Sequence, residues 1–482
     1  MTAIVDEKVA RSHSRLGGSA APRAMAEHTT ETASASTRNK LPRRVQSHKN
    51  LEMTLRLVIL VAAALASFSI ALPAQETASP VPVATPAGIT NPAAATRAWL
   101  DTMPANEKVR SDAYFEGTYW LILWNFLVTV AIALLLLTTR LSARIRDLAA
   151  ALTSFRPVQA GIYAIGFAII TSALNLPLNC YEGFVREHQY GMSNQTFGAW
   201  FGESLKALTI ALVILPIVFA ILYSIFRVAQ RTWWIWGTVF GIILTTFLNI
   251  AGPVFIEPIF NKYTPLTDPK IRDPILALAR ANEIPVQQVF VVDQSRQTKR
   301  VSANVSGLAG TTRIALNDNL LNQCTLPEIR EVMAHEMGHY VLNHGAKITM
   351  SLAIFIFVGF GLAAATFNRV IKKRGPSWGV NGIADPAGFP LLMLIFATYA
   401  FLLTPIANTM TRTIEREADI FGLNAAREPD AAAMVALKLG KYRKMEPTPL
   451  EEFIFFDHPS GRSRIRMAMD WKAAQLPCEN VR

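Results

Sequence analysis

Repeated apolar stretches of about 20 residues constrain the fold of this 482-residue chain more than any other feature. A helix needs about 20 apolar residues to cross the hydrocarbon core of a bilayer. The composition, 51% hydrophobic and only 17% charged, agrees with a chain that crosses a membrane several times. The sequence predicts seven spans, at about 57–74, 119–138, 158–176, 207–226, 234–256, 348–366 and 389–407.

The first stretch has a second interpretation. Read from Met53, it has a basic start, an apolar centre and a small-residue end, which is typical of a cleavable signal peptide. We favour a retained helix, which gives five spans in an N-terminal membrane region at 51–256, with a linker at 75–118. Residues 1–50 are polar and aperiodic, so we expect a disordered basic tail.

A more polar segment begins near residue 257. Strand-like runs at 288–292, 301–305 and 312–316 are bounded by turn residues, and 271–281 has helical spacing. We therefore expect a mainly α, polytopic membrane protein with a small α+β domain. That domain would cover 257–482 and be interrupted by the spans at 348–366 and 389–407.

The net charge of +12 does not indicate a nucleic-acid partner. The basic residues gather in the N-terminal tail and in short loops between spans, where they orient a protein in the lipid bilayer. Three cysteines, widely spaced, form neither a disulfide framework nor a cysteine-based metal site.

The pattern H-E-x-x-H occurs at residues 335–339, in a run with helical character from about 328 to 343. Positions i and i+4 of a helix share a face, so His335 and His339 can direct two imidazoles at one metal ion. Glu336 can then act as a general base toward a water molecule there. Thr325 and Glu328 form a possible capping box at the helix start, and Gly345 follows its expected end.

A zinc site of this kind needs a third protein ligand. No glutamate occurs between His339 and Glu415, and Asp385 is separated from the motif by a single membrane crossing. Two crossings return the chain to the side of the motif just before Glu415 and Glu417. Glu415 and Asp419 are four residues apart and share a helix face, which favours Glu415 as ligand, with Asp419 as a hydrogen-bond acceptor for a ligand histidine. His458, before Pro459, is a candidate for stabilising the oxyanion of the reaction.

The sequence also resembles a known family. The resemblance to the integral-membrane zinc metalloproteases of the type I CAAX prenyl endopeptidase family runs from about residue 181 to 465. It rests on the motifs FVRE at 184–187, EPIFNKYTPL at 257–266, VVD at 291–293, SAN at 302–304, NDNLL at 317–321, HEMGH at 335–339, ExxxD at 415–419 and HPS at 458–460.

The resemblance implies one zinc ion per chain, held by His335, His339 and Glu415, with Glu336 as the base. It also implies that Asn304 and Arg464 contact substrate, that His458 lies near the scissile carbonyl, and that seven helices enclose a chamber beside a gluzincin-like domain. The implied substrates are membrane-associated or prenylated (CAAX-type) polypeptides.

Two alternatives remain open at this point. One is an HtpX-like protease that removes damaged membrane proteins without prenyl dependence, and the other is a non-catalytic membrane scaffold or transporter. The membrane orientation is also open. With seven spans, the basic short loops place the H-E-x-x-H motif on the extracytoplasmic side, whereas the resemblance implies the cytosolic side.

Overall fold

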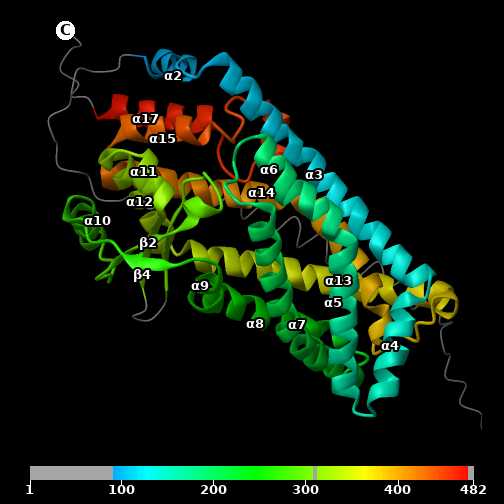
Figure 1. Cartoon of the computed structure of the whole chain (residues 1–482). Coiled ribbons are helices and arrows are strands. Elements are labelled where there is room, and N and C mark those ends of the chain that lie inside the picture. Colours follow the sequence, from blue (N-terminus) through cyan, green and yellow to red (C-terminus); the bar gives the residue numbers. More distant parts are fainter. Residues whose placement is uncertain (1–90, 308–311, 476–482) are drawn as a thin grey trace, which may run out of the picture. The chain divides into compact units, whose positions relative to one another are not determined.

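The computed structural model describes residues 91–307 and 312–475. The predicted span at 57–74, its signal-peptide alternative and the predicted tail at 1–50 lie outside the described residues. Within the described part of the chain, six helices are long and apolar enough to cross a membrane. Five of the six predicted spans from 119–138 onward lie within α3 (Ala105–Thr138), α5 (Arg156–Cys180), α7 (Phe197–Val228), α13 (His344–Trp378) and α14 (Phe389–Ala426) (Figure 1). The predicted span at 234–256 is covered by α8 (Trp233–Ala251) together with the short helix that follows it.

The surfaces of these helices fit a lipid environment. Val213, Ile243 and Phe247 are each 62% exposed although they are large and apolar. Large apolar side chains exposed on long helices would be unfavourable in water, whereas the acyl chains of a bilayer would cover them. Short helices continue two of the spans: η1 (Tyr181–Val185) and α6 (Arg186–Gln189) follow α5, and η2 (Gly252–Ile256) and α9 (Glu257–Phe260) follow α8.

The predicted linker at 75–118 differs from the structure in its described part. Residues Pro92–Asp101 form α2, and α3 begins at Ala105. The Asn91 side chain accepts hydrogen bonds from the amides of Ala93 and Ala94, and Pro92 occupies the first turn, so α2 has a strong N-terminal cap. Leu100 then buries against the C-terminal helices, which holds this Ala-rich segment in place.

The basic short loops meet at one end of the membrane helices. Arg140 donates to the carbonyl of Ser377, and Arg146 pairs with Asp385 at 2.5 Å. These bonds join α4 (Leu141–Leu152) to the turn between α13 and α14. A large apolar core that includes Tyr163, Phe226 and Phe367 lies in the same part of the molecule. These contacts place α4 and the turn between α13 and α14 at the same end of the membrane helices.

A four-stranded sheet has the order β1-β2-β4-β3. The strands are β1 (Tyr263–Pro265), β2 (Val289–Val292), β3 (Ala303–Ser306) and β4 (Arg313–Asn317); β2 and β4 are parallel and the other pairs antiparallel. β1 was not predicted, because three residues that include a proline carry no strand periodicity. β3 lies at one edge of the sheet and, among the described strands, pairs with β4 alone.

Helices α10 (Pro269–Ala281) and α12 (Leu326–Val341) pack with the sheet through a core that contains Ile275, Ile314 and Met333. The remaining helices are α11 (Asp318–Gln323), α15 (Pro429–Leu439), α16 (Pro449–Phe455) and α17 (Gly461–Ala474). The observed class, mainly helical and membrane-spanning with a small α+β unit, confirms the prediction. The division of the chain at residue 257 and the enclosed chamber stay predictions.

Candidate metal centre

Helix α12 carries the H-E-x-x-H motif, and the sequence around it sets its limits. At the start, Thr325 and Glu328 form the expected capping box, with the Thr325 amide donating to Glu328 Oε2 at 2.5 Å. Gly345 does not mark the end of this helix as expected, because it lies inside the next one. The helix ends at Val341, Asn343 adopts a left-handed conformation with φ of 54°, and α13 begins directly at His344. Asparagine tolerates this conformation better than most residues.

The two histidines of the motif point at the same place. Their Nε2 atoms are 3.2 Å apart. Glu415 of α14 approaches both, with Oε2 3.3 Å from His335 Nε2 and Oε1 3.6 Å from His339 Nε2. Ligand atoms of the three residues lie within 4.8 Å of one another, which is close enough for all of them to bind one ion.

Two glycines allow α14 to approach α12 closely enough for this contact. A Cβ on Gly422 would lie 3.0 Å from Glu331 Oε1 and 3.2 Å from the His335 amide nitrogen. A Cβ on Gly338 would lie 3.1 Å from the Phe421 side chain. Because both contacts are tighter than ordinary packing, the helix carrying the histidines and the helix carrying Glu415 meet through residues without side chains.

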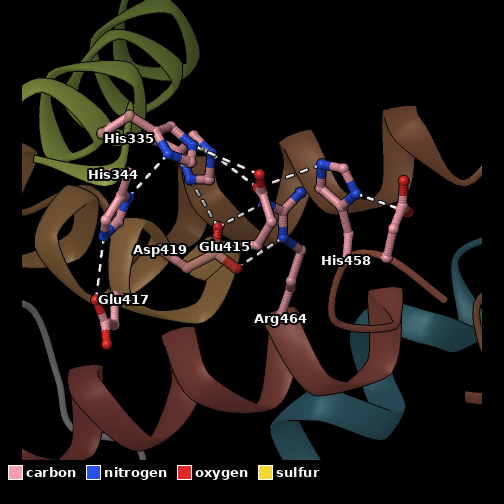
Figure 2. A network of polar contacts seen from close by, with 9 residues as sticks. His335, His344, Glu415, Glu417, Asp419, His458 and Arg464 are labelled. Carbon is pink, nitrogen blue, oxygen red and sulfur yellow. Dashed lines mark hydrogen bonds and ion pairs between the residues drawn. The ribbon is translucent and has the colours of Figure 1, made fainter. Parts of the chain in front are cut away.

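Asp419 lies one turn after Glu415 and binds the other nitrogen of His335. Its Oδ1 is 2.9 Å from His335 Nδ1. Arg464 of α17 holds the same carboxylate with two hydrogen bonds, from Nε at 2.8 Å and Nη2 at 2.6 Å. Figure 2 shows Asp419 between His335 and Arg464. Such a partner fixes the ring and its tautomer, leaving Nε2 for a metal. Arg464 therefore lies behind Asp419, and its contact with substrate stays a prediction.

His344 is a part of the site that the sequence reasoning missed. Its Nδ1 lies 2.9 Å from His339 Nδ1, and its Nε2 lies 3.1 Å from Glu417 Oε2. Glu417, the alternative third ligand, thus contacts His344 and Lys347 behind His339 and does not face the Nε2 atoms of the two ligand histidines (Figure 2). The available signal was a third histidine five residues after His339, at the first position of the next helix.

The surroundings of the two ligand histidines shift the pKa values of their rings in opposite directions. Burial lowers the pKa of His335, but its contact with Asp419 and the nearby carboxylate of Glu415 outweigh burial and raise the pKa to about 10. Burial and the neighbouring His335 lower the pKa of His339 to about 4. The metal-free site therefore holds a proton on His335 at neutral pH, in the position that a cation would take.

The residues present fit a metal ion. Glu415 Oε2 is buried and accepts no well-directed hydrogen bond from any described residue, although it lies 3.3 Å from the Nε2 atoms of both His335 and His458. An unsatisfied buried carboxylate oxygen costs stability unless something else binds it. Two imidazole nitrogens beside it complete a three-ligand set with room for a fourth.

Glu336 and His458 line the same cavity as His335 and Glu415. This cavity has a volume of about 230 Å³ and is also lined by Ser302, Ala303, Glu331, Asp419 and Arg464, with apolar residues of α15 and α17. Burial raises the pKa of Glu336 to about 7, which suits a group that takes up and releases a proton near neutrality. His458 Nδ1 lies 2.8 Å from Asp457 Oδ1, so its Nε2 is turned toward the centre.

Asn304 does not line the cavity at the metal centre. It is on the edge strand β3, paired with Ala315, and its side chain lines a second cavity with Pro253, Glu257 and Ser306. The cavity at the metal centre is bounded instead by Val301, Ser302 and Ala303 of the same segment. The role of Asn304 in binding substrate stays a prediction.

Comparison with known proteins agrees with this geometry. Residues 265–472 match the family model of peptidase family M48, and residues 93–262 match that of the five-helix N-terminal region of CAAX prenyl proteases. Residues 265–472 form a peptidase family M48 domain. The chain is a metalloprotease and a multi-pass membrane protein, with polypeptides as substrates.

Among curated relatives, an uncharacterized metalloprotease, YhfN, of Bacillus subtilis is 28% identical over 71% of this chain and 82% of the relative. CAAX prenyl protease 1 of Saccharomyces cerevisiae is 28% identical over 63% of this chain and 70% of the relative. The crystal structure of S. mikatae Ste24p has the same fold, with a TM-score of 0.66 and 22% identity, over 89% of this chain and 96% of that one.

Proposed function

We propose that this protein is a zinc endopeptidase that cuts membrane-associated polypeptides, among them proteins with a prenylated C-a-a-X-type C-terminus. The observation that carries the proposal is the set of His335, His339 and Glu415. In tetrahedral coordination with Zn–N bonds of about 2.0–2.1 Å, two nitrogen ligands lie about 3.3 Å apart. The Nε2 atoms of the two histidines are 3.2 Å apart.

The surrounding residues would divide the work of hydrolysis. When bound, zinc supplies a Lewis acid that makes a water proton easier to remove and stabilises negative charge on the scissile carbonyl oxygen. Glu336 would take the proton from the attacking water and pass it to the leaving amine. His458 would donate a hydrogen bond to the oxyanion, and Asp419 with Arg464 would keep His335 oriented.

The prenylated substrate class rests on the similarity to proteins named CAAX prenyl protease 1 and on the membrane helices that flank the site. A farnesyl chain would bury apolar surface against such helices, and each buried CH₂ contributes about 0.8 kcal/mol. The net gain in substrate binding is this contribution minus the affinity of the same isoprenoid chain for lipid or detergent, so it is smaller than the buried apolar surface alone would give.

Cleavage of one C-a-a-X peptide with and without an S-farnesyl group tests the substrate class. Purified full-length protein in detergent, loaded with zinc, should cut the farnesylated peptide with a kcat/KM at least roughly tenfold higher, since apolar contacts add affinity. Equal rates on the two peptides would remove prenylation from the proposal and leave a membrane endopeptidase without prenyl dependence.

A further inference from the structure

A cation without a partner lies in the cavity beside the metal centre. Arg443, in the segment between α15 and α16, lines the cavity together with Glu336, Glu415 and His458. Its Nη1 atom is buried and has no hydrogen-bond partner, and its guanidinium forms no ion pair with any residue that the structure describes. Burial lowers the pKa of this guanidinium, and the nearby Arg464 lowers it further.

The segment that carries Arg443 is otherwise well anchored. Lys444 pairs with Glu116 at 2.6 Å and with Glu451 at 2.8 Å, while Glu446 binds Lys108 at 2.6 Å. The carbonyl oxygen of Arg443 itself accepts a hydrogen bond from Ser111 of α3 at 3.2 Å. The guanidinium is therefore held in the cavity by a fixed backbone, and the charged residues directly after it are neutralised.

The acids nearest to Arg443 are already engaged. Asp457 and Glu415 are the carboxylates that act on it electrostatically. Asp457 binds His458, and Glu415 faces the ligand histidines. Arg443 as a whole is only partly buried, but a cation with a buried Nη1 atom and no counter-charge costs the fold stability. A ligand that carries its own negative charge would remove this cost.

Much of the cavity wall beside Arg443 is apolar, although Glu331, Asp419 and Arg464 also line the cavity. Its walls include side chains from α12, α14, α15 and α17: Val332, Leu423, Val435, Leu439 and Met467. An apolar pocket with one placed charge at its wall binds an apolar group that ends in, or lies next to, the opposite charge. The matching ligand is an apolar peptide segment with a carboxylate.

We propose that Arg443 binds a carboxylate of the polypeptide substrate, close to the bond that is cut. The carboxylate would come from the free C-terminus of the substrate or from an Asp or Glu side chain. This inference rests on the proposed peptidase function and narrows it: the enzyme prefers substrates that place a negative charge near the cleavage site. Arg443 would set specificity without taking part in the proton transfers.

Three peptides of one apolar sequence distinguish the sources of the carboxylate. The first has a free C-terminal acid, the second a C-terminal amide, and the third an amide with one glutamate near the cut. Each is made with tails of one to four residues after the cleavage site. They are tested with full-length, zinc-loaded wild type, Arg443→Gln and, as a matched control, Lys441→Gln, which alters an exposed cation two residues away.

Wild type should cut the free acid or the glutamate peptide at least roughly tenfold faster than the plain amide, since pairing a desolvated charge contributes strongly. The better of the two identifies the source. Arg443→Gln should abolish the preference by slowing the charged peptide to the rate of the amide, and Lys441→Gln should retain it. Equal rates for all three peptides in wild type, or a preference that survives Arg443→Gln, would overturn the proposal.

Two further measurements separate this proposal from its premise. Affinity of the acid and the amide peptides is measured by direct binding, which needs no cleavage. Acid-selective binding that depends on Arg443, without hydrolysis, would support the carboxylate site and contradict the peptidase function; hydrolysis without acid selectivity would do the reverse. Arg443→Gln should also melt at the same or a higher temperature, because it removes an unpaired buried charge, whereas a purely structural arginine would lower the melting temperature when replaced.

Discussion

Each of the two ligand histidines uses its second ring nitrogen, but the partners differ. His335 contacts a carboxylate directly, at Asp419, while His339 reaches Glu417 only through the ring of His344. In the second arrangement, an N–H on His339 Nδ1 requires His344 to accept at Nδ1 and to donate from Nε2 to Glu417. When a metal is bound, both arrangements keep the remaining ring proton on Nδ1 and leave Nε2 of the ligand histidine to the metal.

Proton release on zinc binding follows from the pKa of His335. Because that pKa is raised to about 10, the ring is protonated in the metal-free protein at pH 7.5, and zinc must displace the proton. His339 is already neutral, since its pKa is lowered to about 4. Zinc affinity should therefore rise about tenfold per pH unit between pH 7 and 9.

Calorimetric titration of metal-free protein with zinc, in buffers of different ionisation enthalpy, measures this release directly. We expect at least one proton per zinc ion at pH 7.5, and one fewer proton in Asp419→Asn, which lacks the negative charge that raises the pKa of His335. An affinity that does not change with pH over this range would contradict the assignment.

Loss of the ring of His344 should weaken metal binding. In His344→Gln, His339 loses its acceptor, and we expect zinc affinity to fall by about 10–100-fold, as for other partners of ligand histidines. His188→Gln is the control, because that ring also makes two hydrogen bonds, to the carbonyls of Phe184 and Gln195, without contacting the ligand histidines. Equal zinc affinity in wild type and His344→Gln would show that the ring is not needed.

Helices α12 and α14 carry the residues of the metal centre. The sequence predicted the start of α12 but not the full length of α14. The capping box and the i, i+4 spacing predicted the start of α12 and the direction of its histidines. The lack of glutamates before residue 415 predicted a third ligand from beyond two membrane crossings. Spacing along α14 could not show that this helix runs unbroken from Phe389 to Ala426, which carries Glu415 directly from the last span.

Other features depend on contacts between distant segments and carry no local pattern. His344 acts on the centre only because α13 begins without a loop after Asn343. Arg443 lies in no recognisable motif. It lacks an ion-pair partner because Asp457 and Glu415 contact histidines instead. The close approach at Gly338 and Gly422 likewise becomes visible only when both helices are placed.

A methyl group at Gly422 should disturb the centre at the level of helix packing. In Gly422→Ala the new Cβ meets the backbone of His335, which cannot move without displacing a ligand. We expect a loss of about 1–3 kcal/mol in stability and a clear drop in bound zinc.

Gly361→Ala is the matched control within α13, where a Cβ would have no atom within 4 Å. It should leave zinc content unchanged, with stability equal or up to about 1 kcal/mol higher, since alanine favours a helix. Metal analysis and thermal melts measure the zinc content and the stability of both variants. Full zinc content in Gly422→Ala would mean that the two helices have room to separate.

At the scale of the whole molecule, the centre lies between membrane helices and a soluble-type fold. α12 belongs with the sheet, α14 is the extension of a membrane span, and α17 supplies Arg464 from the C-terminal helices. Arg140 and Arg146 hold the start of α4 to the end of α13 and the turn before α14. Orientation in the bilayer depends on the number of spans before α3, which local sequence patterns do not fix.

The turnover of Glu336→Gln at full zinc occupancy tests the central claim most directly. Glutamine has nearly the same shape as glutamate and leaves His335, His339 and Glu415 in place, but it cannot accept the proton of the attacking water. The account predicts zinc content equal to wild type and peptide hydrolysis reduced by at least about a hundredfold. Hydrolysis near the wild-type rate by the zinc-loaded variant would contradict it.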